Sequence, residues 1–149
     1  MEKRILADRF ENEKFIIEYY SGESLVEFSM KDQELEKNDV IEMHNVTLGF
    51  TQTRNYATLF RAMDFFSLSN EARQEGSKRH YSAFVIVQAF VVKNLAQRLV
   101  GNFIMRFNPP VRETRLFSNA EDARRWLKNK VAAYLVAEIE KKRMLSPVE

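Results

Sequence analysis

The first thirty residues contain three short runs rich in apolar residues, which predict β-strands, and the last of these runs alternates between apolar and polar positions. The runs are Arg4–Phe10, Lys14–Tyr20 and Val26–Met30, and polar turns at 11–13 and 21–24 separate them. Strands joined by such short turns pair with one another in antiparallel fashion. This end of the chain is therefore predicted to form an antiparallel sheet.

After these strands the apolar residues recur every three or four positions, which predicts a helix. The helix is expected to start near Asp39 and to end at Gly49 and the polar stretch Thr51–Asn55. Its apolar side consists of Val40, Met43, Val46 and Phe50.

The middle of the chain predicts two strands on either side of a short helix. The first strand covers Tyr56–Met63 and is closed by Asp64. Ser69 is expected to cap the helix, which ends around Gly76. Ser82–Phe90 is almost continuously apolar, and such a run favours a strand buried on both faces, as in the centre of a parallel sheet.

The last third of the chain predicts two longer helices separated by a short strand. Apolar residues at helical spacing run from 92 to 107, and Asn108–Pro110 ends that helix because proline cannot continue the hydrogen-bond ladder. A strand over Glu113–Phe117 follows, and Ser118 or Asn119 is expected to cap the final helix. An apolar stripe of Val131, Leu135 and Ile139 indicates that this helix continues or restarts towards the C-terminus.

This order of elements, βββ-α-β-α-β-α-β-α, predicts an α/β fold with an α+β-like N-terminal end. We expect a mixed β-sheet flanked by helices, with right-handed crossovers between parallel strands. The chain shows no internal repeat or long linker. It is expected to form a single domain over residues 1–149, with 129–149 as a C-terminal helical extension.

Composition narrows the class of protein. The 149 residues include no cysteine, which excludes disulfides and thiolate metal ligands and agrees with a cytoplasmic location. The longest mostly apolar stretch, Ala83–Val92, is too short to span a bilayer, and no signal peptide is visible. A net charge of only +2 predicts no nucleic-acid partner.

Several segments together resemble one family. Between Tyr56 and Lys128 the strongest stretch is Asn94–Phe103 followed by Asn108–Pro110, and Thr114–Leu127 gives a short strand and a capped helix with an Ala-x-x-Trp-Leu ending. About half of the chain thus resembles STAS-like (sporulation anti-sigma-antagonist type) domains of uncharacterised bacterial proteins. The resemblance implies a mixed α/β fold and a regulatory role.

Better-known members of that family bind a protein partner and carry a phosphorylated serine at a strand–loop–helix junction. The corresponding junction here is Asp64–Arg73, although Phe65 and Phe66 stand where those regulators have small polar residues. In the simpler interpretation, Ser69 only caps the helix. The candidate partner or regulatory residues are Asp64, Phe65, Phe66, Ser67, Ser69 and Arg73.

A second candidate surface is a basic stripe on the helix predicted from residue 92 to 107. Asn94, Arg98, Asn102 and Arg106 are spaced four apart along it, and Lys93 adjoins them. Residues four apart share one helix face, so the stripe can hold an acidic partner or a phosphate, or it is simply the solvated side of the helix. Gly101 within this helix is explained by close packing against a neighbouring helix or against another subunit, and the second of these favours a homodimer.

No pattern of an active site is present. His44 and His80 belong to no metal-ligand motif, and no serine lies in a G-x-S-x-G setting. The four glycines are too scattered for a phosphate-binding loop. Basic residues surround Trp126, a pattern that can bind nucleic acid, but core packing is the favoured role for this tryptophan. We therefore expect no enzyme and no cofactor.

Two functional hypotheses follow. The first is a cytoplasmic protein-interaction or regulatory module, homodimeric and with a protein partner that the sequence does not identify. The alternative is a carrier or sensor of a small apolar ligand in a phenylalanine-lined pocket. The residues considered for that pocket are Phe10, Phe15, Phe28, Phe60, Phe65, Phe66, Phe84, Phe90, Phe103 and Phe107.

Overall fold

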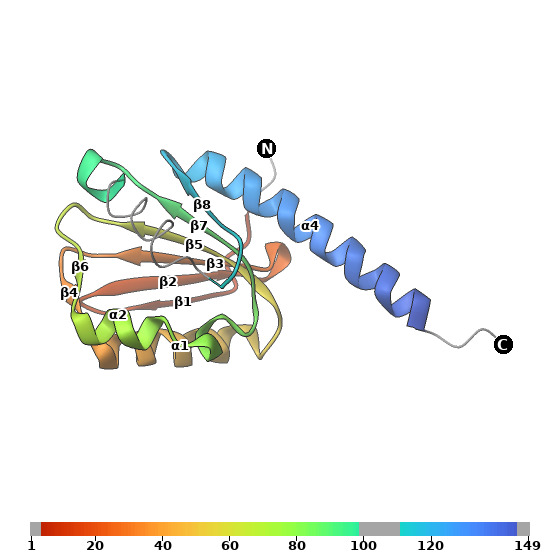
Figure 1. The fold of residues 1–149 in the computed structure, drawn as a ribbon, viewed down its shortest axis with the longest axis horizontal. Coiled ribbons are helices and arrows are strands. Elements are labelled where there is room, and N and C mark those ends of the chain that lie inside the picture. The colour runs from red at the N-terminus through yellow and green to blue at the C-terminus, as the bar shows by residue number, and fades with distance from the viewer. Residues whose placement is uncertain (1–3, 99–110, 146–149) are drawn as a thin grey trace.

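A computed structural model describes residues 4–98 and 111–145 (Figure 1). The strands are β1 (Asp8–Glu11), β2 (Phe15–Tyr20), β3 (Leu25–Met30), β4 (Glu34–Leu35), β5 (Tyr56–Ala62), β6 (Ser67–Leu68), β7 (Val85–Val91) and β8 (Thr114–Phe117). The α-helices with described bounds are α1 (Lys37–Thr51), α2 (Asn70–Gly76) and α4 (Ala120–Leu145). A 3₁₀ turn, η1 (Ser21–Glu23), joins β2 to β3, and a second, η2 (Arg79–Ser82), lies between α2 and β7.

The main sheet has the strand order β1-β2-β3-β5-β7-β8, and β4 and β6 form a separate parallel pair. β1, β2 and β3 pair in antiparallel fashion, as the short turns predict. β3, β5, β7 and β8 are parallel. The predicted mixed sheet flanked by helices is confirmed, and β7 has a parallel neighbour on each side, as its apolar run predicts.

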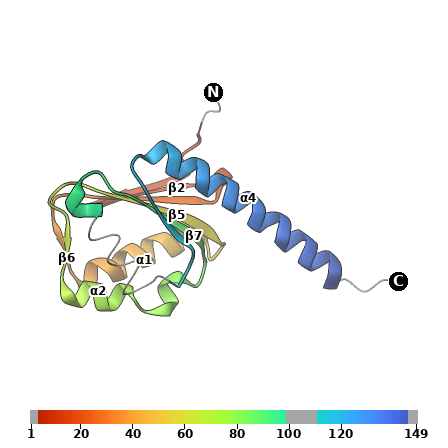
Figure 2. The same ribbon diagram turned by 45° about the horizontal axis from the view of Figure 1, so that its top comes forward.

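Helices cover the two faces of this sheet unequally. Figure 2 shows α1 and α2 under one face and α4 across the other. The α1 side buries alternate residues of the antiparallel strands, including Phe15, Ile17 and Phe28, against Met43 of α1. The α4 side buries Leu59 and other residues of β5, β7 and β8 against the apolar positions of α4, which are Ala123, Leu127 and Val131.

Helix α1 begins and ends slightly outside the predicted limits. It starts at Lys37 rather than near Asp39, because Asp39 acts as a capping residue whose carboxylate accepts a hydrogen bond from the Glu36 amide at 2.8 Å. Gly49 does not end the helix, which continues to Thr51. It stops where Gln52 and Thr53 adopt left-handed backbone angles, with φ of 52° and 59°.

Two strand boundaries were predicted wrongly. β1 starts at Asp8 rather than Arg4, since the side chain of Arg4 turns to Glu23 and Glu27 and the chain is exposed around Ile5. β7 starts at Val85 rather than Ser82, because residues 79–82 form a 3₁₀ turn.

The C-terminal helix is continuous. Asn119 caps it, since its side-chain oxygen accepts a hydrogen bond from the Asp122 amide at 2.8 Å. α4 then runs over 26 residues to Leu145, so residues 129–145 extend the same helix rather than forming a new one. The helix predicted from residue 92 starts at Leu95 instead, since residues 92–94 are not helical; residues 95–98 are helical, and the predicted part from 99 to 107 lies outside the described residues.

Two phenylalanines of opposite exposure provide a matched pair of substitutions. Phe15 is fully buried on the α1 side, whereas Phe65 is 81% exposed. We expect Phe15→Ala to lower the free energy of unfolding by about 3–5 kcal/mol because it leaves a cavity in the core. Phe65→Ala is expected to change it by less than about 0.5 kcal/mol. Urea denaturation followed by circular dichroism measures both, and equal losses would contradict this description of the core.

Candidate functional site

Four of the predicted partner residues, Asp64–Ser67, lie near the start of the predicted basic stripe, where the parallel strands of the sheet end. The loop that contains Asp64 follows β5, and Lys93 and Asn94 follow β7. Ser118 follows β8, the last parallel strand. Open α/β sheets bind their ligands at the carboxyl ends of parallel strands. We call this region, formed by residues 63–67, 93–98 and 118, the carboxyl-edge surface.

Hydrogen bonds hold the loops of the carboxyl-edge surface against one another. The Asn94 side chain donates to the Asp64 carboxylate at 3.4 Å, and the Gln97 side chain donates to the Met63 carbonyl at 3.3 Å. The Phe65 amide donates to the Asp32 carboxylate, on the loop after β3, at 2.9 Å. Segments 30 or more residues apart in the sequence therefore form one surface here.

The two adjacent phenylalanines of this surface, Phe65 and Phe66, differ in burial. Phe66 is half-buried and packs against the α1-side core. Phe65 points away from the core and is 81% exposed. Two further apolar side chains of the same loops are exposed, Met63 at 51% and Leu95 at 71%. The apolar side chains of Met63, Phe65 and Leu95 are therefore exposed to solvent instead of being buried in the core.

The serines of the junction also differ. The side chain of Ser69 accepts a hydrogen bond from the Ala72 amide at 3.1 Å, so Ser69 is the predicted N-cap of α2. Ser67 lies exposed on β6. Arg73 is exposed on α2, away from the loop bonds described above.

Only part of the predicted basic stripe can be placed. Lys93 is exposed beside β7, and Arg98 donates to the Ser118 hydroxyl at 3.3 Å. Asn102, Arg106 and Gly101 lie outside the described residues.

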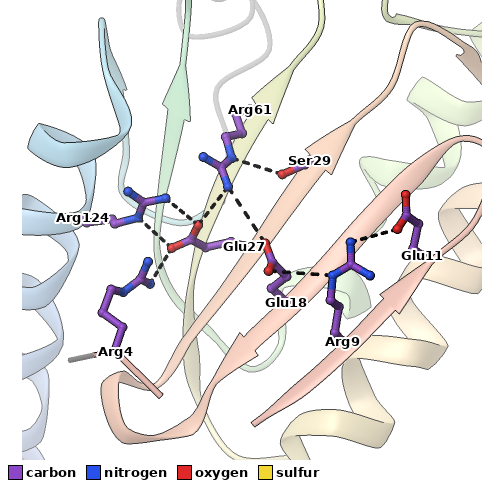
Figure 3. Close-up of polar contacts among 8 residues, drawn as sticks. All are labelled: Arg4, Arg9, Glu11, Glu18, Glu27, Ser29, Arg61 and Arg124. Atoms are coloured by element: carbon purple, nitrogen blue, oxygen red, sulfur yellow. Dashed lines mark hydrogen bonds and ion pairs between the residues drawn. The ribbon is translucent and has the colours of Figure 1, made fainter. Parts of the chain in front are cut away.

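A second group of polar residues, which the sequence analysis missed, surrounds Glu27 (Figure 3). Glu27 is fully buried on the α4 side of β3. Arg124 of α4 binds both of its carboxylate oxygens, at 2.8 and 2.9 Å, and Arg4 donates to one of them at 2.6 Å. Arg61 of β5 approaches the carboxylate at 3.5 Å and also donates to the Ser29 hydroxyl at 3.1 Å. We call these residues the Glu27 network.

The charges of the Glu27 network stabilise one another. Burial alone raises the pKa of the Glu27 carboxyl, but the hydrogen bonds and positive charges of Arg124 and Arg4 outweigh burial, and the pKa lies below its usual value of 4.5. Burial alone lowers the pKa of Arg4 and Arg124, but the hydrogen bonds to Glu27 and its negative charge outweigh burial and raise the pKa of both guanidinium groups above its ordinary value. Glu27 is therefore ionised at neutral pH, and a carboxylate bound in this way acts as a structural anchor.

Ion pairs continue from this network across the strands that α4 leaves uncovered. Glu18 of β2 lies 4.0 Å from Arg61 and 4.0 Å from Arg9 of β1, and Arg9 pairs with Glu11 at 2.8 Å. These side chains are 20–45% exposed. On the face of the sheet that α4 crosses, the antiparallel strands β1 and β2 thus carry charged side chains, whereas the parallel strands carry the apolar side chains that pack under α4.

The basic residues around Trp126 serve the fold. Arg124 binds Glu27, and Lys130 pairs with Glu113 at 2.9 Å. Trp126 packs beside Phe117 in the α4-side core, which confirms the predicted core role of this tryptophan.

The two histidines, His44 of α1 and His80 of η2, lie close together in a third group of polar residues. Their rings lie 5.6 Å apart, and both contact Tyr81. Burial and the charge of His80 lower the pKa of His44. Tyr81 donates to the buried Glu75 carboxylate at 2.9 Å. Within residues 4–98 and 111–145, no group of three or more histidine, aspartate or glutamate side chains is arranged to hold a metal ion.

The described phenylalanines mostly pack against one another. The rings of Phe28, Phe60 and Phe90 stack across three strands, with centroids 4.7 and 4.9 Å apart. A cavity under α4 has a volume of about 10 Å³, which is room for at most one water molecule, and no phenylalanine lines it. Phe103 and Phe107 lie outside the described residues. The ligand pocket stays a prediction, without support from this part of the chain.

The Glu27 network leads to a stability prediction. Glu27→Gln keeps the shape of the side chain but removes the charge that three arginines share. We expect it to lower the free energy of unfolding at pH 7 by roughly 2–4 kcal/mol, because breaking a buried ion pair is costly. The cost is not larger because the arginines stay partly exposed and water can solvate their charges. Glu18→Gln, on the same face but with contacts at 4.0 Å, is expected to cost less than about 1 kcal/mol. Denaturant titration compares the two variants, and equal losses would show that the network does not anchor the fold.

Comparison with known proteins places the chain in a family. No curated protein and no solved structure matches it significantly. A family described as a domain of unknown function (DUF7793) matches residues 19–131, from the end of β2 into α4. The match includes Glu27, Arg61, Arg124 and the carboxyl-edge surface, whereas Arg4 and the end of α4 lie outside it. The chain belongs to the family of DUF7793 domains.

Proposed function

We propose that this domain is a protein-interaction module of a regulatory kind, and that its partner binds the carboxyl-edge surface. The observation that carries the proposal is Phe65, an aromatic ring 81% exposed on a loop whose backbone is held by Asp32. A rigid exposed aromatic side chain loses little entropy on binding, and aromatic residues are enriched at the centres of protein interfaces.

The neighbours of Phe65 support the same interpretation. Met63 and Leu95 add exposed apolar area on the adjoining loops, and Asp64 and Asn94 add polar groups beside them. A mixture of apolar anchors and hydrogen-bonding groups is typical of an interface that forms and dissociates.

The resemblance to STAS-like domains suggests how such an interface is regulated. Ser67 is exposed beside Phe65, and a phosphate there would add negative charge next to the partner surface. Ser69 is less suited to modification, because its hydroxyl caps α2. A cytoplasmic location and the absence of catalysis remain part of this proposal.

Photo-crosslinking in cells of the source organism tests the surface directly. A photoreactive residue at position 65 is expected to capture a defined partner, whereas the same residue at position 5 is not. Ile5 is a matched control because it is also apolar and 77% exposed.

The captured partner then allows a binding measurement with purified proteins. Phe65→Ser is expected to weaken its affinity at least about tenfold, since interface anchors contribute more than 1 kcal/mol, while the circular dichroism spectrum stays native. Phe66→Ser is unsuitable because Phe66 packs against the core. Equal crosslinking at positions 5 and 65, or an unchanged affinity, would refute the proposal.

A further inference from the structure

The first strand of the sheet, β1, leaves one of its edges open. Among the described residues, β2 is its only neighbour in the sheet. The two strands pair in antiparallel fashion, and the Asn12 amide donates to the Phe15 carbonyl at 3.0 Å. Backbone groups alternate in direction along an antiparallel strand, so the amides and carbonyls of Arg9 and Glu11 point away from β2. An edge of this kind can pair with a strand of another chain.

The side chains of β1 differ between the two faces of the sheet. Arg9 and Glu11 lie side by side on the face that α4 crosses, and their side chains are 45% and 38% exposed (Figure 3). Phe10 lies on the opposite face, where it packs against the α1-side core beside Phe15, with ring centroids 5.8 Å apart. Three consecutive positions of the strand therefore carry a base, an aromatic ring and an acid.

Antiparallel pairing of β1 with a second β1 has one register that matches all of these groups. In that register Phe10 of one copy lies opposite Phe10 of the other, and Arg9 of each copy lies opposite Glu11 of the other. The outward amides and carbonyls of each such Arg9–Glu11 pair then bond to one another. Residues directly opposite in two strands share one face of the sheet, so the opposite charges of each pair are neighbours as well.

Other registers lose one of these matches. A shift by two residues sets Arg9 opposite Arg9 or Glu11 opposite Glu11, and like charges directly opposite are destabilising. A shift by one residue sets the outward backbone groups of one strand opposite the inward groups of the other, so their hydrogen bonds cannot form. The order of residues in β1 thus selects a single pairing, about a twofold axis at Phe10.

We propose that the open edge of β1 pairs with the same edge of a second copy of this chain, which joins the two sheets into one. A twofold interface uses the same residues on both copies, as this self-complementary order requires. A strand of a different protein could bind the edge without any such order. The edge shares no residue with the carboxyl-edge surface, so this proposal does not depend on the proposed function.

The length of β1 sets the expected strength of the dimer. Its four residues span about 14 Å, which gives an interface at the small end of the range for specific association. We therefore expect a reversible dimer with a dissociation constant of about 10–200 µM. Sedimentation equilibrium of the full chain between about 5 and about 500 µM is expected to show the passage from monomer to dimer.

Charge reversal tests the pairing of the side chains. Arg9→Glu and Glu11→Arg are each expected to dimerise at least about tenfold more weakly, because each sets like charges opposite one another. A mixture of the two variants restores opposite charges at both positions and is expected to form a heterodimer. Glu121→Arg is the control, since Glu121 is 85% exposed on α4, and its dimerisation should equal that of the native chain. Circular dichroism verifies that all variants fold.

Disulfide formation tests the register, because the chain has no cysteine of its own. Chains carrying Arg9→Cys and chains carrying Glu11→Cys are oxidised mildly, separately and as a mixture. In the proposed register, position 9 lies about 5.5 Å from position 11 of the other copy between Cα atoms, which a disulfide can bridge. Two copies of position 9, or of position 11, are diagonal neighbours about 7–8 Å apart. The mixed disulfide is therefore expected to form in preference to either symmetric one.

Three results would overturn the proposal. The first is a native chain that stays monomeric at the highest concentration. The second is a mixture of the charge-reversed variants that is no more dimeric than its components. The third is equal disulfide formation in the mixture and in the separate cysteine variants.

Discussion

One buried carboxylate holds together three parts of the chain that are far apart in sequence. Glu27, in the middle of the sheet, shares its charge with Arg4 near the N-terminus, Arg61 of β5 and Arg124 of α4. A buried, unpaired carboxylate would cost several kcal/mol, so the fold is stable only when the arginines are in place. The pairing therefore helps to fix where α4 crosses the sheet, and the position of α4 decides which strands it covers.

Because α4 covers β5, β7 and β8, the two ends of the same sheet face differ in character. The covered end buries Leu59, Val87 and Phe117 under the helix. The uncovered end carries ion pairs such as Arg9 with Glu11. Exposed apolar side chains lie at the carboxyl-edge surface, among them Met63, Phe65 and Leu95. This surface is where the proposal of a partner site originates.

The sequence predicts the parts of this structure that depend on local patterns. A few residues are enough to encode the aromatic and β-branched run of β2, the alternation in β3, the apolar run of β7 and the caps at Ser69 and Asn119. The Glu27 network is not, because Arg4, Arg61 and Arg124 lie 23, 34 and 97 residues from Glu27. The available signal was a charged residue, Glu27, in the middle of a predicted strand. In the same way, adjacent residues Phe65 and Phe66 are alike in sequence, and only tertiary packing separates the exposed ring from the half-buried one.

The most direct test is a pH titration of the Glu27 carboxyl by NMR, with the signal assigned through Glu27→Gln. The Glu27 network predicts a pKa below the usual 4.5 in the folded protein. Because the pKa is depressed by folding, the stability that Glu27 contributes is complete above about 4.5 and is lost as the pH falls through the folded value. A pKa at or above 4.5 would mean that the arginines do not hold this carboxylate ionised, and would contradict the account.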